Sequence, residues 1–191
     1  YLEWTLPHSP SDTRGNRRYF TIASSPTEET IRLGLKFNNP ASSFKRALQA
    51  MQINDTISAS QLDGDFVLPR DASQKLAFIA GGIGITPFRS MVQYLMDKNE
   101  KRDAVLLYVN KADTEPAYRD VFDRATKVLG MKTSYVSKVD SSLIAREIPD
   151  YRERTVYISG PPGMVDTYKK TLRAMGVSRL AIKTDYFPGL A

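Results

Sequence analysis

Residues 76–88, LAFIAGGIGITPF, decide how this chain folds. A short apolar run predicts a buried strand, and the glycines that follow, Gly81, Gly82 and Gly84, allow a sharp turn and a close approach of backbone to a ligand. Pro87 suits the first turn of a helix, where its missing N–H costs nothing, and Thr86 is expected to cap that helix. A strand, a glycine turn and a helix N-terminus together predict a site that attracts an anion such as phosphate.

A second junction of the same kind lies at residues 156–165, VYISGPPGMV. Here a β-branched and aromatic run ends at Ser159, and Gly160, Pro161 and Pro162 form a stiff turn before another helix. Neither junction is a Walker motif, because no Gly-Lys-Ser/Thr follows, nor a GxGxxG motif with an acid about 20 residues later. Two such loops at neighbouring strand ends predict one ligand crevice at the switch point of a doubly wound sheet.

Apolar strands and amphipathic helices alternate through residues 75–191, which predicts βαβ units and a five-stranded parallel sheet. The expected strands are 75–80, 103–110, 132–137, 154–159 and 179–185, and the expected helices are 86–99, 116–129, 141–148 and 163–175.

Residues 1–70 follow a different pattern, with short β-type runs separated by turns. Strands are expected at 1–6, 17–24, 30–37 and 55–62, and one helix at 42–51 with Ser42 or Ser43 as its N-cap. This pattern predicts a small antiparallel barrel, joined to the second domain by a linker at 68–75. The expected fold class is therefore α/β: a five-stranded, parallel, doubly wound sheet (75–191) preceded by a partial antiparallel β-barrel (1–70).

Composition excludes several classes of function. The 191 residues include no cysteine, which excludes disulfides, thiolate metal sites and Fe–S ligation by this chain. The only histidine, His8, is expected to be a solvated loop residue, so no metal site is predicted.

The net charge of +6 is spread over the whole sequence, which favours anionic small molecules or an acidic protein as partners over nucleic acid. No apolar run is long enough to span a membrane. We expect a cytoplasmic protein, or the cytoplasmic portion of a larger membrane-associated one.

Four motifs in order, RYFT, GGIGITP, SGPPGM and DYFPG, resemble those of the ferredoxin–NADP⁺ reductase superfamily, and the resemblance covers nearly the whole chain. It implies a flavin barrel, a nicotinamide dinucleotide domain, and FAD and NADP (or NAD) as cofactors. By the match to RYFT, Arg18 would pair with the flavin phosphates, Phe20 would lie against the isoalloxazine ring, and Thr21 would face the reactive flavin nitrogen. Ser42 and Ser43 match a second flavin loop more loosely.

The resemblance also implies the dinucleotide site. Gly81, Gly82, Gly84, Thr86 and Pro87 would hold the pyrophosphate, while Gly160, Pro161 and Pro162 would guide the nicotinamide toward the flavin. Ser137 and Lys138 resemble a Ser-Arg pair that contacts the 2′-phosphate of NADP, and Tyr118 and Lys111 are reserve candidates expected at the surface. Asp185 would join a polar network near the flavin, and Phe187 would cover the flavin face. Thr21, Ser159 and Asp185 are the expected catalytic residues.

Two departures from the family pattern matter. Many members carry a cysteine before GPP, where this chain has Ser159; we expect the serine to modulate the rate, since hydride transfer needs stacked rings and no protein nucleophile. The family's barrel also has strands before the point where this chain begins, so we expect the chain to be a fragment. Its open barrel edge could pair with another copy.

Three hypotheses follow. The first is a flavin-dependent NAD(P)H oxidoreductase that passes electrons to a separate, unknown acceptor protein or domain. The second is a non-catalytic dinucleotide-binding or interaction module, because the barrel is incomplete. The third is an ordinary dehydrogenase, disfavoured because no catalytic His is plausible and the Tyr168–Lys170 run is interpreted as a solvated helix face.

Overall fold

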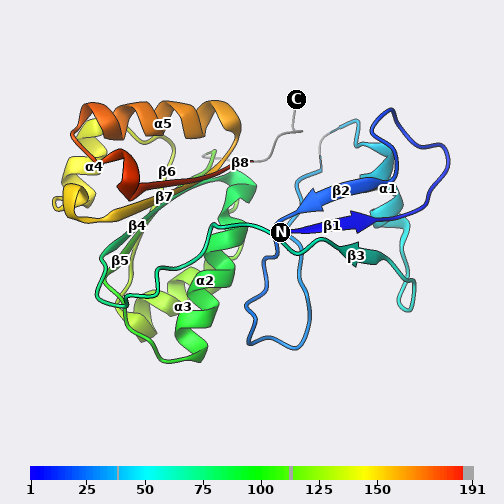
Figure 1. Cartoon of the computed structure of the whole chain (residues 1–191), viewed down its shortest axis with the longest axis horizontal. Coiled ribbons are helices and arrows are strands. Elements are labelled where there is room, and N and C mark those ends of the chain that lie inside the picture. The colour runs from blue at the N-terminus through cyan, green and yellow to red at the C-terminus, as the bar shows by residue number, and fades with distance from the viewer. Residues whose placement is uncertain (38, 112–113, 187–191) are drawn as a thin grey trace.

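A computed structural model describes residues 1–37, 39–111 and 114–186 of the chain. It divides into an N-terminal part (residues 1–65), with a small antiparallel sheet and one helix, and a C-terminal part (residues 66–186), with a larger sheet and the other helices (Figure 1). Among the described residues, no helix is both long and apolar enough to cross a bilayer.

The larger sheet has five parallel strands, as predicted, and their order is β6-β5-β4-β7-β8. They are β4 (Leu76–Gly81), β5 (Ala104–Val109), β6 (Lys132–Val136), β7 (Thr155–Gly160) and β8 (Ile182–Tyr186). The chain runs outward from β4 to β6 and then returns to the other side of β4. This reversal makes β4 and β7 neighbours at the switch point, so the two glycine loops that follow them share one edge of the sheet.

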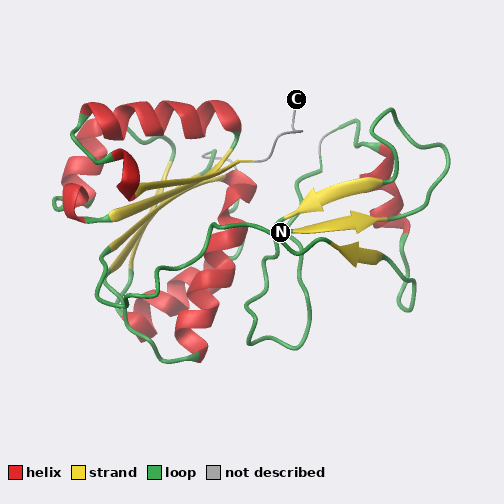
Figure 2. Ribbon diagram, viewed as in Figure 1, coloured by secondary structure: helices red, strands yellow, loops and turns green. Residues whose placement is uncertain are grey.

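Helices cover both faces of this sheet (Figure 2). Strand residues alternate between two cores: Phe78 and Tyr157 pack on one face and Ile79 and Ile158 on the other. The first face is covered by α2 (Thr86–Asp97) and α3 (Arg119–Leu129), and the second by α4 (Ser141–Glu147) and α5 (Pro162–Ala174). Single 3₁₀ turns lie at Gly82–Ile85 (η1), Tyr151–Glu153 (η2) and Arg179–Ala181 (η3).

Tyr168 departs from its expected place on a solvated face. It is buried in the second core, and its hydroxyl accepts a hydrogen bond from the Val139 amide at 3.4 Å. The expected strand at 179–185 begins as the 3₁₀ turn η3, and β8 starts only at Ile182.

The N-terminal part contains β1 (Leu2–Thr5), β2 (Arg17–Phe20) and β3 (Ser58–Ser60) in the antiparallel order β2-β1-β3. Helix α1 (Ser43–Ala50) covers the sheet through Phe44, which packs with Leu2, Trp4 and Leu6. The strand expected at 30–37 is not formed, and only one bridge, Ile22 to Leu33, remains of it. The next residue, Gly34, packs against the C-terminal part instead of continuing a ladder. Phe66, just before the expected linker, and Leu68, its first residue, already pack on the larger core.

Arg154 joins three strand ends at the amino edge of the larger sheet. Its side chain is buried, donates to the carbonyl oxygens of Leu76 and Asp103, and forms ion pairs with Asp103 and Asp150 at 2.8 and 2.6 Å. Hydrogen bonds from Arg154, together with Lys75, lower the pKa of Asp150 to about 2. A carboxylate whose pKa is lowered by folding stabilises the folded state above its ordinary pKa, and that stabilisation is lost as the pH falls toward 2.

We expect Arg154→Met to lower the free energy of unfolding by about 2 kcal/mol at pH 7, because buried carbonyls lose a donor and two carboxylates lose their partner. Urea unfolding followed by far-UV circular dichroism measures the change. The loss should shrink as the pH is lowered from 5 toward 2, since Asp150 then becomes protonated in both proteins. Arg146→Met is the control, because Arg146 is 70% exposed and should change stability by less than about 0.5 kcal/mol. Equal effects of the two substitutions would contradict this role.

Candidate functional site

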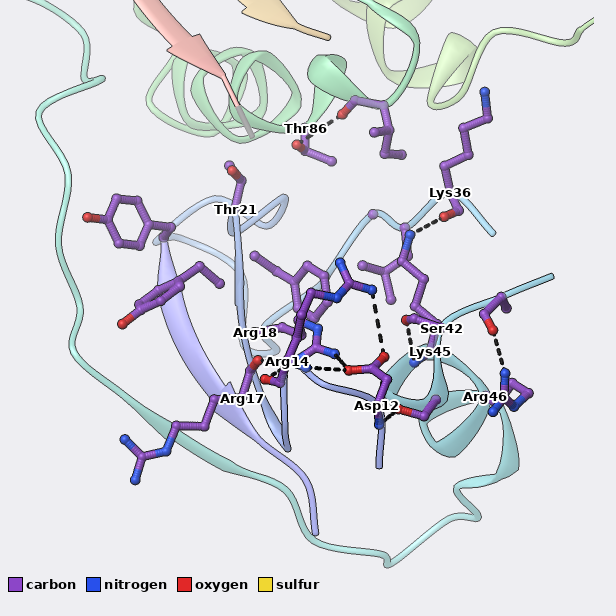
Figure 3. Close-up of a pocket in the computed structure, with 18 of the residues that line it drawn as sticks. Asp12, Arg14, Arg17, Arg18, Thr21, Lys36, Ser42, Lys45, Arg46 and Thr86 are labelled. Atoms are coloured by element: carbon purple, nitrogen blue, oxygen red, sulfur yellow. Dashed lines mark hydrogen bonds and ion pairs between the residues drawn. The ribbon is translucent and has the colours of Figure 1, made fainter. Parts of the chain in front are cut away.

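The two parts of the chain enclose one pocket of about 1110 Å³ (Figure 3). From the N-terminal part it is lined by Phe20 and Thr21 at the end of β2, by residues 34–36, and by the start of α1. From the C-terminal part it is lined by Ile83 and Thr86, at the glycine turn and the start of α2, and by Asp185 near the end of β8. The carboxyl edge of the parallel sheet therefore opens directly onto the RYFT segment.

The lining of the pocket is predominantly basic. Six cationic side chains face three carboxylates around it; the cations are Arg14, Arg17, Arg18, Lys36, Lys45 and Arg46, and the acids are Asp12, Asp63 and Asp185. Helix α1 points its N-terminus at the same place, where Ser42 caps the helix by accepting from the Lys45 amide at 3.4 Å. A concentration of positive charge at a helix N-terminus fits a phosphate-bearing ligand.

Arg18 is held rigidly in this lining. Its guanidinium donates to Asp12 at 2.7 Å and to the carbonyl oxygens of Arg14, Gly15 and Arg17 at 2.9, 3.0 and 2.6 Å. Although burial acts to raise the pKa of Asp12, hydrogen bonds from Arg18 and from the Arg14 amide lower it to about 2. Asp12 is therefore ionised at neutral pH and keeps the Arg18 fork in one orientation before any ligand arrives.

Ser43 and His8 differ from their expected settings. The buried Ser43 Oγ accepts from the Asp12 amide at 2.9 Å and lies 2.9 Å from His8 Nε2, while His8 Nδ1 lies 2.7 Å from the Leu6 carbonyl oxygen. His8 also packs edge-on against Phe44. The expectation of a solvated His8 is wrong, because the ring is half-buried and ties the loop before β2 to α1. A phosphate contact from Ser43 stays a prediction.

The glycine loop forms the 3₁₀ turn η1 and is closely packed. A side-chain carbon on Gly84 would overlap the carbonyl oxygen of Ser159, and one on Gly81 or Gly160 would overlap Met164. Gly82 has a φ of +52°, in the left-handed region that favours glycine. Tyr108, from β5, donates its hydroxyl to the Gly82 carbonyl at 3.1 Å and so fixes the start of the turn.

Thr86 opens α2 but does not cap it, contrary to expectation. The N-cap position is Ile85, and the Thr86 hydroxyl donates to the Ile83 carbonyl at 3.2 Å. The reason is that η1 runs directly into α2, so that the helix has no extended residue before it whose side chain could cap it. Pro87 occupies the first turn, as predicted.

Ser159 lies in the interior of the sheet beside Asp185. The two residues are paired in the β7–β8 ladder, and Ser159 also pairs with Ala80 of β4. Ser159 Oγ is fully buried and has no hydrogen-bond partner among the described residues. Burial raises the pKa of Asp185. A polar pair therefore lies where β7 and β8 reach the pocket, and its catalytic role stays a prediction.

The structure brings together part of the predicted site. The residues that line the pocket are Arg18, Phe20, Thr21, Ser42, Ser43, Thr86 and Asp185. The residues of the two glycine loops lie at the adjoining sheet edge: Gly81, Gly82, Gly84, Pro87, Ser159, Gly160, Pro161 and Pro162. Ser137 and Lys138 are exposed after β6, two strands away from β4. Phe187 lies outside the described residues.

Sequence reasoning missed or misplaced residues that connect the two parts. Tyr118, expected at the surface, is half-buried, and its hydroxyl lies near Gly34. Glu28 and Arg89 form an ion pair across the interface. A glycine inside the 30–37 strand pattern was one available signal, since an isolated glycine there indicates a close approach of backbone.

Among the described residues, no cluster of three or more His, Asp or Glu side chains could hold a metal ion.

Known proteins are similar to this chain in sequence. Residues 78–170 match the oxidoreductase NAD-binding domain family. A flavohemoprotein of Bacillus subtilis is 24% identical over 89% of this chain and 46% of its own length. The NADH oxidoreductase HCR of Escherichia coli is 24% identical over 91% of this chain and 55% of its own length. An NADPH oxidoreductase of Mycobacterium tuberculosis is 30% identical over 60% of this chain and 32% of its own length. The chain spans about half the length of such curated relatives, or less.

Solved structures agree on the fold. A cytochrome P450 reductase of Amycolatopsis superposes with a TM-score of 0.82 at 20% identity, over 98% of this chain and 60% of its own. The ferredoxin–NADP⁺ reductase of Plasmodium falciparum superposes with a TM-score of 0.78 at 18% identity, over 97% of this chain and 82% of its own. Residues 78–170 therefore carry the match to the oxidoreductase NAD-binding domain, and the chain as a whole has the fold of ferredoxin–NADP⁺ reductases.

Proposed function

We propose that this chain is the reductase portion of a flavin-dependent NAD(P)H oxidoreductase, which moves electrons from NAD(P)H through FAD to a separate acceptor. One observation carries the proposal: the same pocket is lined by the RYFT segment and by the start of α2, directly after the glycine loop. A nucleotide bound at the carboxyl edge of the parallel sheet and a ring system bound against Phe20 would therefore meet inside this pocket.

The donor set of the pocket fits a flavin dinucleotide. Arg18 and the N-terminus of α1 at Ser42 would hold the pyrophosphate, and the remaining cations would neutralise its charge. Phe20, whose ring packs 5.9 Å from that of Phe44, would support one face of the flavin ring. Bound flavin supplies the chemistry that the side chains lack: it takes two electrons together and releases them singly.

The C-terminal part fits the nicotinamide dinucleotide. The first amides of η1 have no side-chain cap, and a side chain at Gly82 would meet nothing within 4 Å, so a pyrophosphate would be held there, at the end of β4. The Pro161–Pro162 turn would lie beside the nicotinamide at the end of β7. Asp185, whose pKa is raised by burial, can hold a proton beside Ser159. These residues bind, orient and exclude water, and positioning of this kind lowers the barrier without a protein nucleophile.

The test is to purify the chain, add FAD, remove oxygen and titrate with NADPH or NADH. We expect a bound flavin absorbance spectrum that either nucleotide bleaches. If neither nucleotide bleaches it, in this chain or in any longer protein that carries it, the enzymatic proposal is wrong. The small sheet has only three strands in the described part of the chain, which favours a non-catalytic binding module as the second candidate. That module would bind nucleotide without any change in a flavin spectrum.

The relatives do not choose between the nucleotides, since one is named for NADPH and another for NADH. We expect Lys138→Ala to weaken NADPH binding about tenfold, as loss of one cation–phosphate contact of about 1.4 kcal/mol predicts, and to leave NADH binding unchanged. Isothermal titration with each nucleotide measures this difference. Lys132→Ala is the control, because Lys132 lies at the other end of β6 and pairs with Glu147. Equal losses for NADPH and NADH would remove the assignment of Lys138 to the 2′-phosphate.

A further inference from the structure

One face of α2 is joined to the N-terminal part by polar contacts that the proposed function does not use. Arg89, three residues after Thr86, is 5% exposed. It donates from both terminal nitrogens to the carboxylate of Glu28, with Nη2 to Oε1 at 2.8 Å, and Nη1 also donates to the Ala23 carbonyl at 3.2 Å. A two-pronged pair of this kind fixes both the distance and the angle between its partners.

Further contacts extend this face along the helix. The hydroxyl of Ser90 donates to the Ser24 carbonyl at 2.7 Å, and the hydroxyl of Thr27 donates to Asp97 at the end of α2. All the N-terminal partners lie within residues 23–28. That segment begins two residues after Thr21, and α2 begins immediately after the glycine loop.

Backbone packing continues the contact at the start of the helix. Gly34 lies so close to Thr86, Ile83 and the Tyr118 hydroxyl that a side-chain carbon on it would overlap Thr86. The guanidinium of Arg89 also lies over the ring of Tyr118, 5.8 Å from its centre. The two motifs that would hold the flavin and the nicotinamide are therefore connected through one small interface.

We propose that the Glu28–Arg89 ion pair is a positioning contact, which sets the separation and angle between the flavin site and the nucleotide site. The proposal rests on the proposed function and adds to it the residues that align its two cofactors. Both residues lie outside the pocket lining, so they act through the orientation of α2 relative to β2 and not by touching either ligand.

The ion pair is better suited to this task than the other contacts. Thr27 and Asp97 are exposed, where a hydrogen bond competes with water, whereas the side chains of Arg89 and Glu28 are only 7% and 18% exposed. If the two side chains were separated, each would be left as a buried charge without its partner. Small movements of α2 away from residues 23–28 are therefore strongly unfavourable. Arg32 also approaches Glu28, at 3.5 Å, but it is 59% exposed and contributes little by the same reasoning.

The first test needs no cofactor. Trp4, the only tryptophan, is buried in the N-terminal part, so its fluorescence reports unfolding there. Four of the five α-helices found in the described residues lie in the C-terminal part, so far-UV circular dichroism reports mainly on that part. In urea we expect the two signals to change together in the wild type and in Arg32→Met. In Glu28→Gln and Arg89→Lys, the fluorescence transition should occur at lower urea than the dichroism transition.

The second test measures electron transfer with both cofactors bound. At saturating nucleotide, we expect flavin reduction to be at least tenfold slower in Glu28→Gln and Arg89→Lys, with unchanged dissociation constants for FAD and for NADPH, because misplacement lowers the rate and not the affinity. Arg89→Lys retains the charge and guards against a variant that fails to fold. If both variants retain coincident unfolding and reduce flavin as fast as Arg32→Met, the positioning role is refuted. A wild type that shows no reduction would refute the proposed function, while the unfolding comparison would still decide whether this pair couples the two parts.

Discussion

Gly84→Ala is expected to abolish flavin reduction by NADPH and by NADH and to lower the free energy of unfolding by about 3 kcal/mol. The new methyl group would overlap the carbonyl oxygen and carbon of Ser159 and the Cα of Gly160. All three are backbone atoms at the end of β7, and Ser159 and Gly160 pair with β8. The methyl can therefore be accommodated only by separating η1 from β7, which opens the crevice between the two glycine loops.

Gly163→Ala provides the matched control for this prediction. Gly163 lies in the first turn of α5, in the second glycine loop, and nothing lies within 4 Å of the position that its side chain would take. Alanine is also the better helix former by about 1 kcal/mol, so this variant should be at least as stable as the wild type and equally active. Urea unfolding and anaerobic reduction assays measure both quantities. A Gly84→Ala protein that behaves like Gly163→Ala would show that the close packing at the switch point is not needed.

Arg18→Ala is expected to raise the dissociation constant for FAD about 100-fold, equivalent to about 2.7 kcal/mol, as loss of a charge-assisted contact to phosphate predicts. The effect should exceed that of any other single cation in the pocket. Arg18 is only 13% exposed on its side chain and is already oriented by Asp12 and three carbonyl oxygens, so little entropy is lost when it binds. Titration of the chain with FAD, followed by flavin fluorescence, gives the constant.

Arg17→Ala distinguishes a specific contact from a general effect of charge. Arg17 precedes Arg18 on β2, also lines the pocket, and carries the same charge. Its side chain, however, is 65% exposed and lies 3.6 Å from Glu3. We expect this variant to weaken FAD binding no more than a few-fold. If the two substitutions weaken FAD equally, the pocket attracts the flavin by net charge alone, and Arg18 has no special place in it.

The repeating pattern of the second half made the five-stranded sheet predictable. Apolar runs such as 76–80 are buried on both faces, and they can form only central strands between helices. The loops were predictable for a related reason: Gly84 and Gly160 occupy positions where a side chain would collide with backbone or with Met164, so no other residue type serves there. Local constraints of this kind are visible in a single sequence.

The contacts between the two parts of the chain were not predictable in the same way. Nothing local to Glu28 or Arg89 shows that these residues, 61 positions apart, meet in the folded chain. His8 and Tyr118 were misplaced for the same reason, because each is covered by a segment distant in sequence. The strand expected at 30–37 was wrong for the same reason. Its residues alternate as in a strand, but Gly34 packs against Thr86 of the C-terminal part and does not pair with a neighbouring strand. Long-range packing overrides local propensity at such positions.

Gly34 has a consequence for the motion of the two parts relative to each other. Where side chains form an interface, they can change rotamer in picoseconds to nanoseconds, and the gap between the two surfaces fluctuates with them. Here one surface is bare backbone, and the other is presented by Thr86, a buried and β-branched residue with few rotamers. The spacing at this point is therefore governed by the stiffness of the peptide chain. If the proposed reductase function holds, a contact without rotameric freedom would keep the distance between the two cofactors nearly constant from one turnover to the next.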